Sequence, residues 1–155
     1  MDPFAVVTWE RDGYVVSTDP DRLDLGVVHR YLSEASYWAR GVPRTVVERS
    51  VANSLAFGLY AVESGTQVGF ARAVTDRATF AYLADVFVLP AHRGRGLGRW
   101  LNACVLDHPD LQGLRRLLLT TQDAHGLYEQ VGFVRAPFPE RFMVIDRPDL
   151  YRSEP

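Results

Sequence analysis

Two hydrophobic patterns divide the chain into strand-like and helix-like segments. Runs rich in β-branched and aromatic residues that end at turn residues predict strands, and apolar positions spaced three or four apart predict helices. The predicted strands cover residues 14–18, 56–63, 67–75, 79–89, 116–120, 133–135 and 142–145. The first predicted helix has Asp21 or Asp24 as its cap and runs to about residue 33. The others cover residues 45–54, 97–106 and 124–130, the last of them capped by Asp123. This order of elements predicts a mixed α+β fold.

The segment 79–89 is the best candidate for a central strand. Residues 82–89 are apolar at nearly every position, which is typical of a strand buried on both faces. Asp85 is the exception. The turn at Ser64-Gly65 joins two further strands into a hairpin, so three antiparallel strands are expected in succession before the glycine-rich turn that follows residue 89.

Composition narrows the class of protein. A length of 155 residues predicts one domain over 1–155, and 47% hydrophobic residues are enough for a core. A net charge of -2 argues against a nucleic-acid partner. The single cysteine, Cys104, excludes an internal disulfide and most zinc sites, so no metal is expected. No apolar run reaches about 18 residues, so we expect a cytoplasmic protein without a membrane partner.

The candidate chemistry lies in residues 93–98, Arg-Gly-Arg-Gly-Leu-Gly, between a predicted strand and a predicted helix. Glycine lets the backbone approach a phosphate, and the first N–H groups of a helix attract anions. Arg93, Arg95 and Arg99 add positive charge. All 17 basic residues of the chain are arginine, so a Walker loop, which needs lysine, is excluded. An RNA-binding arginine–glycine box remains an alternative.

Two motifs together resemble the GNAT superfamily of acetyltransferases, and in particular its small single-domain bacterial members. Arg93, Gly96 and Gly98 match its acetyl-CoA-binding pattern, which follows a bulged central strand. Residues 124–133, Ala-His-Gly-Leu-Tyr-Glu-Gln-Val-Gly-Phe, match its second signature. The resemblance implies the GNAT fold, a mixed sheet with antiparallel N-terminal strands and a splay between strands 79–89 and 116–120.

The resemblance also implies a reaction and a set of site residues. Acetyl-CoA would be the co-substrate, and a primary amine of a small molecule or protein would attack it directly. The backbone of Arg93, Gly94, Arg95, Gly96, Leu97 and Gly98, with Arg99, would bind the pyrophosphate. The N–H of Val88 or Phe87 would polarise the thioester carbonyl, and Tyr128 would protonate the leaving thiolate. Thr121 stands where many members have an asparagine, and it or Gln122 would replace that contact.

The sequence does not decide which residue is the general base or which residues bind the acceptor. Asp85 is either the base or a structural carboxylate bonded to a neighbouring backbone group or arginine. His125 is either a base acting through water or a solvated or capping residue, and His92 is expected near the phosphates. The expected acceptor side chains are Tyr31, Tyr37, Trp38, Arg40, Phe80, Tyr82, Phe138 and Arg141. Their alternative role is in core packing or in a homodimer.

Two functions from different classes therefore compete. The first is an acetyl-CoA-dependent N-acetyltransferase. The second is a non-catalytic acyl-CoA-binding module, which is favoured by the missing asparagine at Thr121 and the undecided base.

Overall fold

A computed structural model describes residues 5–152 of the chain. Its strands are β1 (Thr8–Arg11), β2 (Tyr14–Ser17), β3 (Leu55–Ala61), β4 (Gln67–Thr75), β5 (Phe80–Val88) and β6 (Arg116–Leu118). Its helices are α1 (Leu25–Arg30), α2 (Arg44–Ala52), α3 (Leu97–Asp107) and α4 (His125–Glu129). Asp24 caps α1, and a π-helical turn, Tyr31–Ala35, prolongs it. The mixed α+β class is confirmed.

The six strands form one sheet in the order β1-β2-β3-β4-β5-β6. All neighbours are antiparallel except β5 and β6, which are parallel. β6 pairs only with Phe80, Ala81 and Tyr82 at the start of β5. Beyond Tyr82 the two strands separate, so the second half of β5 has no strand on that side. This is the expected splay.

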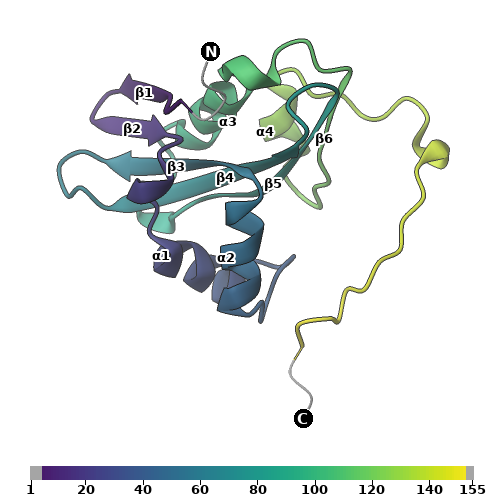
Figure 1. The fold of residues 1–155 in the computed structure, drawn as a ribbon, viewed down its shortest axis with the longest axis horizontal. Helices are drawn as coiled ribbons and strands as arrows, with labels where there is room; N and C mark the ends of the chain where they lie inside the picture. The colour runs from purple at the N-terminus through teal and green to yellow at the C-terminus, as the bar shows by residue number, and fades with distance from the viewer. Residues whose placement is uncertain (1–4, 153–155) are drawn as a thin grey trace.

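Each face of the sheet carries its own hydrophobic core. In Figure 1, α1 and α2 lie on one face and α3 and α4 on the other. Leu101 and Cys104 of α3 pack with Phe57 and Leu59 in the core on the α3 face, and all four are almost fully buried. The core on the α1 face contains Val28, Leu32, Val47, Phe70 and Phe87.

The sheet begins with a hairpin that the sequence pattern did not predict. β1 pairs with β2 across Asp12-Gly13, and both turn residues have positive φ, 46° and 83°. Asp-Gly at such a turn is a strong hairpin signal, and it was present in the sequence. β1 is mostly exposed, which explains why its hydrophobic pattern is weak.

A bulge interrupts β5 at Asp85. Ala71 of β4 faces two residues of β5, Asp85 and Val86, where regular pairing would give one. Asp85 adopts φ 56°, in the left-handed region. A non-glycine residue in that region costs about 1–2 kcal/mol, so the surrounding structure must hold it there.

The bulge also changes which face of the sheet each side chain meets. Before it, Ala81 and Leu83 pack in the core on the α3 face, and after it Val86 and Val88 do so. Strict alternation would have placed the second pair on the opposite face. Phe87 consequently packs in the core on the α1 face.

The last two predicted strands are wrong. Residues 133–135 and 142–145 form no ladder, although their residue types suit strands. A strand needs a partner for its N–H and C=O groups, and neither segment has one in the part of the chain that the structure describes. Figure 1 shows the chain after α4 leaving the body as a long arm.

Candidate active site

The glycine-rich loop joins the end of β5 to the start of α3 and forms the anchor of the site. Gly94 and Gly96 have φ 80° and 74°, so both positions require glycine. Among the described residues, no carbonyl accepts from the backbone N–H groups of Gly96, Leu97 or Gly98; the first bond of the helix runs from Trp100 N–H to the Gly96 carbonyl. These free donors at the N-terminus of an 11-residue helix suit an anion.

Gly98 has a different reason to be glycine. It lies inside α3 with no positive φ, and a Cβ there would meet only Leu127, at an ordinary contact distance of 3.7 Å. Alanine would favour the helix by about 1 kcal/mol. Nothing within the chain therefore requires glycine at this position, which points to a ligand that comes close to the backbone.

The three arginines of the loop serve different purposes. Arg93 donates from Nε to the Val88 carbonyl at 2.9 Å and from an Nη to the Tyr31 hydroxyl at 3.0 Å. Arg95 turns away and donates to the Tyr14 hydroxyl at 2.7 Å. Arg99 lies on the first turn of α3 and lines the groove described next. Arg93 thus fixes the loop against β5, and Arg99 is the arginine most available to a ligand.

A groove of about 670 Å3 runs from this loop along the splay of the sheet. Its walls come from the π-helical turn, the end of β5, the loop and α4. The lining residues include Tyr31, Trp38, Val86, Phe87, Val88, Arg93, Gly94, Gly96, Leu97, Gly98, Arg99, Asp123, Leu127 and Tyr128. A long ligand with an anionic end fits this shape, because the free N–H groups lie at one end and apolar side chains follow.

One backbone N–H of β5 points into the splay. Leu89 donates to the Val68 carbonyl of the neighbouring segment at 2.8 Å. Successive N–H groups of a strand point to opposite edges, so the N–H of Val88 faces away from β4. The Val88 carbonyl faces the same way, since it accepts from Arg93. Of the two predicted donors, Val88 rather than Phe87 therefore faces the groove.

Tyr128 stands where three cavities meet. It lines the groove, a smaller pocket of about 110 Å3 and the cavity that His125 also lines. Its ring packs at the edge of Phe133, with centroids 5.9 Å apart. Within residues 5–152 its hydroxyl has no hydrogen-bond partner. Burial, and secondarily the nearby Tyr37 and Asp123, raise the pKa of Tyr128 to about 12, so the phenol keeps its proton at neutral pH.

The smaller pocket contains Asp85, whose two carboxylate oxygens are both engaged. Oδ2 accepts from Arg72 Nε at 2.6 Å, and Oδ1 accepts from the Trp38 indole at 2.8 Å. The Arg72 and Asp85 side chains are only 18% and 10% exposed. This matches the structural alternative considered for Asp85, and it explains how a residue with positive φ is held. The ion pair also joins β4 to β5 and fixes Trp38.

Three other predicted site residues, Thr121, His92 and His125, line different cavities. Thr121 lines the smaller pocket, not the groove, and its hydroxyl accepts from the Ala124 N–H at 3.0 Å. It therefore orders the turn before α4. No side chain caps this helix, so the cap expected at Asp123 is not formed. His92 lines the groove and contacts the Tyr14 hydroxyl at 2.8 Å. His125 lines a separate surface cavity.

The expected acceptor residues divide among three cavities. Tyr82 lines the smaller pocket, and Tyr37 and Trp38 line both this pocket and the groove. Tyr31 lines the groove, where it stacks on Phe87 at 4.0 Å. Phe138 and Arg141 line a third cavity, next to β6. Neither Arg40 nor Phe80 lines any of these three. Gln122 donates its backbone N–H to the Tyr37 hydroxyl at 3.0 Å.

Sequence reasoning missed two contributors to the site. Arg72 was not singled out, because its partner becomes clear only when the bulge turns Asp85 toward it. Leu127 lines the groove against Gly98; it lies one residue before Tyr128 in the second signature, so a signal was available.

Three further features bear on the sequence predictions: metal-binding clusters, membrane-spanning helices and the single cysteine. Across residues 5–152, no group of three or more His, Cys, Asp or Glu side chains is arranged to hold a metal ion. None of the described helices is long and apolar enough to cross a membrane. Cys104 is a buried free thiol, and burial raises its pKa to about 12, as expected for a core residue.

Comparison with known proteins agrees with this architecture. The model of the acetyltransferase (GNAT) family matches residues 27–133. A crystal structure of a GNAT protein from Xanthomonas campestris pv. campestris, described there as an acetyltransferase by inference, is 49% identical. It covers 93% of this chain and 100% of its own, with a TM-score of 0.88. The chain belongs to the GNAT family of acetyltransferases.

Two more distant likenesses show how widely the architecture occurs. A Gibberella zeae protein provisionally named an acetyltransferase is 35% identical over 145 residues, which is 80% of this chain and 81% of that protein. A Deinococcus radiodurans structure, 20% identical over 94% of this chain and 98% of its own, has a TM-score of 0.70 and shows the shared fold alone. Relatives thus occur in a fungus as well as in bacteria.

Proposed function

We propose that this protein is an N-acetyltransferase that uses acetyl-CoA and acetylates a primary amine on a small molecule or a protein. The observation that carries the proposal is the position of Tyr128, which lines both the long groove and the small pocket beyond it. A cosubstrate in the groove and an amine in the small pocket would meet beside its hydroxyl.

The residues of the groove suit coenzyme A. The free N–H groups of Gly96, Leu97 and Gly98, together with Arg99, would hold the pyrophosphate. Gly94 leaves open space where a side chain would otherwise stand, and the backbone of Arg93 and Arg95 shapes the loop. Bound acetyl-CoA would supply an acetyl thioester.

Two groups of the chain would act on that thioester. The Val88 N–H would donate to the carbonyl oxygen as negative charge develops there, which is the role of an oxyanion-hole donor. The Tyr128 hydroxyl would donate to the sulfur. A phenol of pKa about 12 gives up its proton less readily than a thiol of pKa ~8.5, so Tyr128 would act by hydrogen bonding to the sulfur as the C–S bond breaks, and any proton transfer would come late.

The amine must lose a proton before or during its attack. Asp85 borders the small pocket, but its oxygens already accept from Arg72 and Trp38. We propose that Asp85 mainly positions Trp38 and the bulge and that it accepts the proton only if the amine displaces the indole. Thr121 faces the acceptor side and supports α4.

The same engagement of Asp85 favours a second candidate, a non-catalytic acyl-CoA-binding module without a free base. Both candidates predict binding of acetyl-CoA, measured by titration calorimetry, at micromolar affinity. Only the enzyme predicts release of free thiol when amines or peptides are added. Binding without turnover above hydrolysis for any acceptor would support the module, and no binding of any acyl-CoA would contradict both.

Tyr128→Phe tests the chemistry once an acceptor is found. We expect kcat to fall about 10²-fold, because the leaving sulfur loses its hydrogen-bond donor and late proton source, with little change in acetyl-CoA affinity. Tyr151→Phe is the control, because Tyr151 packs against the other core and should leave kcat unchanged. Since the chain contains no lysine, acetyl-lysine detected in a peptide assay comes from the acceptor. Cytoplasmic location and acetyl as the acyl group remain predictions.

A further inference from the structure

The groove and the small pocket meet at a junction, and five residues line both cavities. They are Tyr37, Trp38, Val86, Asp123 and Tyr128. An amine in the small pocket reaches a thioester in the groove only across this junction. Asp123 is the only carboxylate among the five, whereas Asp85 lines the small pocket alone.

The carboxylate of Asp123 is free to bind a ligand. Thr121 orders the turn before α4, and Asp123 makes no cap there. Across residues 5–152, neither oxygen of Asp123 has a hydrogen bond or an ion pair. Asp85 is the opposite case, because Arg72 and Trp38 bind both of its oxygens. Asp123 can therefore accept a proton without breaking an existing bond.

Asp123 lies close to Tyr128 and is also open to water. Burial is the main cause of the raised pKa of Tyr128, and the charges of Tyr37 and Asp123 add to it, so the carboxylate and the phenol lie within each other's electrostatic field. The Asp123 side chain is exposed, whereas Tyr128 is half-buried. A proton that reaches Asp123 can therefore pass directly to solvent.

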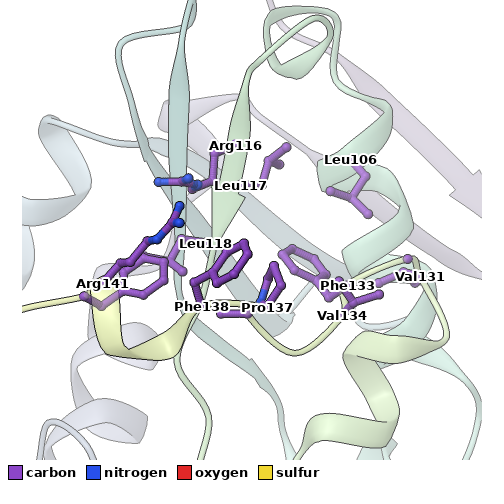
Figure 2. A pocket seen from close by; sticks show the side chains of 13 residues that line it. Leu106, Arg116, Leu117, Leu118, Val131, Phe133, Val134, Pro137, Phe138 and Arg141 are labelled. Carbon is purple, nitrogen blue, oxygen red and sulfur yellow. The ribbon is translucent and has the colours of Figure 1, made fainter.

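The small pocket carries a net negative charge. Arg72 neutralises Asp85, and the described residues that line the pocket include neither an arginine nor a histidine. The charge of Asp123 is therefore uncompensated. Figure 2 shows Arg141, a cation expected at the acceptor site, in the separate cavity beside β6.

The aromatic side chains of the pocket also suit a cation. The rings of Tyr37 and Trp38 meet edge to face with centroids 5.0 Å apart, and Tyr82 lines the same pocket. Faces of such rings attract ammonium groups. A carboxylate on the acceptor would instead meet the charge of Asp123 with no cation to offset it.

On the basis of the function proposed above, we propose that Asp123 binds the acceptor as an alkylammonium ion and takes its proton. The N–H bond breaks, its electron pair stays on nitrogen, and the proton joins the carboxylate and then passes to water. The neutral amine attacks the acetyl carbon. Its second proton leaves the nitrogen as the C–S bond breaks and restores the proton that Tyr128 gives to the sulfur. The acceptor is accordingly a primary alkylamine without a carboxylate near the nitrogen.

The first test measures binding without any reaction. The protein is saturated with CoA, which has no acetyl group, and is titrated by calorimetry with propylamine or with β-alanine, which has the same carbon chain and ends in a carboxylate. We expect propylamine to bind about tenfold more tightly than β-alanine. Asp123→Asn should weaken propylamine binding about tenfold or more, because the ammonium loses a charged hydrogen-bond acceptor, without lowering CoA affinity.

Glu129→Gln is the matched control. It removes an exposed carboxylate of α4 that lines neither the groove nor the small pocket, and it should change neither affinity. Equal propylamine affinity in the wild-type and Asp123→Asn proteins overturns the proposal. So does the absence of propylamine binding to the CoA complex at millimolar concentrations.

The second test follows kcat/KM for an acetylated alkylamine against pH. The wild type binds the charged amine and removes its proton, so kcat/KM should stay level from neutral pH up to the pKa of the free amine. Asp123→Asn can use only the neutral amine already in solution, so its kcat/KM should rise about tenfold per pH unit below that pKa. A level profile in Asp123→Asn overturns proton transfer to Asp123.

The other ionisable groups at the two cavities are present in both proteins, so the difference between the profiles reports Asp123. On the pocket side they are Tyr37, Tyr82, Asp85 and Tyr128. On the groove side they are Tyr31, His92, Arg93 and Arg99. Absence of CoA binding, or of any thiol release by the wild type, would overturn the proposed function and the role of Asp123 together. Thiol release with the same profile in both proteins overturns the role of Asp123 alone.

Discussion

The two ends of the sheet differ in how completely they are paired. From β2 to the first half of β5 every strand has two neighbours, and β2 and β3 are buried on both faces. From Leu83 onward, β5 has one neighbour, β6 is three residues long, and the last extended segments have none. The paired end is scaffold, and the groove and the acceptor pocket both adjoin the open end.

The two ends of the sheet should differ most in how much a substitution lowers the free energy of unfolding. Phe57 is fully buried in β3, and Phe57→Ala should lower the free energy of unfolding by about 3–5 kcal/mol, because it leaves a cavity in the core. Ile145, 84% exposed in the segment after α4, should cost less than about 0.5 kcal/mol when changed to alanine. Urea denaturation measures both. A large effect at Ile145 would mean that this segment packs on the sheet.

The boundary between the two ends lies at the bulge, and Asp85→Asn tests what holds it. Asparagine can still accept from Trp38, but the ion pair with Arg72 is lost. We expect a loss of about 1–3 kcal/mol in unfolding free energy, because a mostly buried guanidinium loses its counter-charge. Glu48→Gln, in the exposed pair with Arg44, is the matched control and should change stability by less than about 1 kcal/mol. Unchanged stability together with a large loss of kcat would instead make Asp85 the base.

Gly98→Ala should separate stability from binding. The helix should become slightly more stable, by up to about 1 kcal/mol, since the new methyl group meets only Leu127. Acetyl-CoA affinity should fall about tenfold or more, because the methyl group enters the space next to the phosphate donors, and tenfold corresponds to about 1.4 kcal/mol. Gly126→Ala in α4, where a Cβ meets nothing within 4 Å, is the control. Equal affinity for the two variants would place the phosphates elsewhere.

The smallest expected effect is on the pH dependence of catalysis. Tyr128 has its pKa raised to about 12 by burial, so kcat should show no decline from its ionisation until the pH exceeds about 11. An unfolded tyrosine ionises near pH ~10. The unfolded state therefore loses its proton first, and the share of stability that depends on Tyr128 falls as pH rises from about 10 to about 12. A decline in kcat centred near pH ~10 that disappears in Tyr128→Phe would contradict this pKa.

Local signals predicted the paired end and the loop well. The hairpin at Ser64-Gly65 and the glycines at 94 and 96 depend on backbone geometry that few other residues allow, so sequence alone was sufficient. The cap of α4 was assigned to Asp123, but no side chain caps this helix, and Thr121 instead accepts from the Ala124 N–H. The residue types suit a cap, and only the path of the backbone decides whether one forms.

The open end could not be predicted in the same way. Residues 142–145 have the composition of a strand, but a strand exists only where a partner is available, and composition does not specify the partner. Likewise, the Arg72–Asp85 pair depends on one extra residue in β5, which shifts the register between strands that are themselves predictable. Sequence periodicity describes each segment separately, and these two features depend on the relation between segments.

The bulge at Asp85 also determines how this chain tolerates changes in length. Removing this single residue would restore regular alternation along β5 and would leave Val86 and Val88 on the α3 face and Phe87 on the α1 face. The two cores would keep their side chains, but Arg72 and Trp38 would lose the carboxylate that binds them both. A deletion at the Ser64-Gly65 turn would only shorten an exposed loop. Among homologues of this chain, we therefore expect most length variation in the turns, and a homologue that lacks the bulge residue should also have changed Arg72 and Trp38.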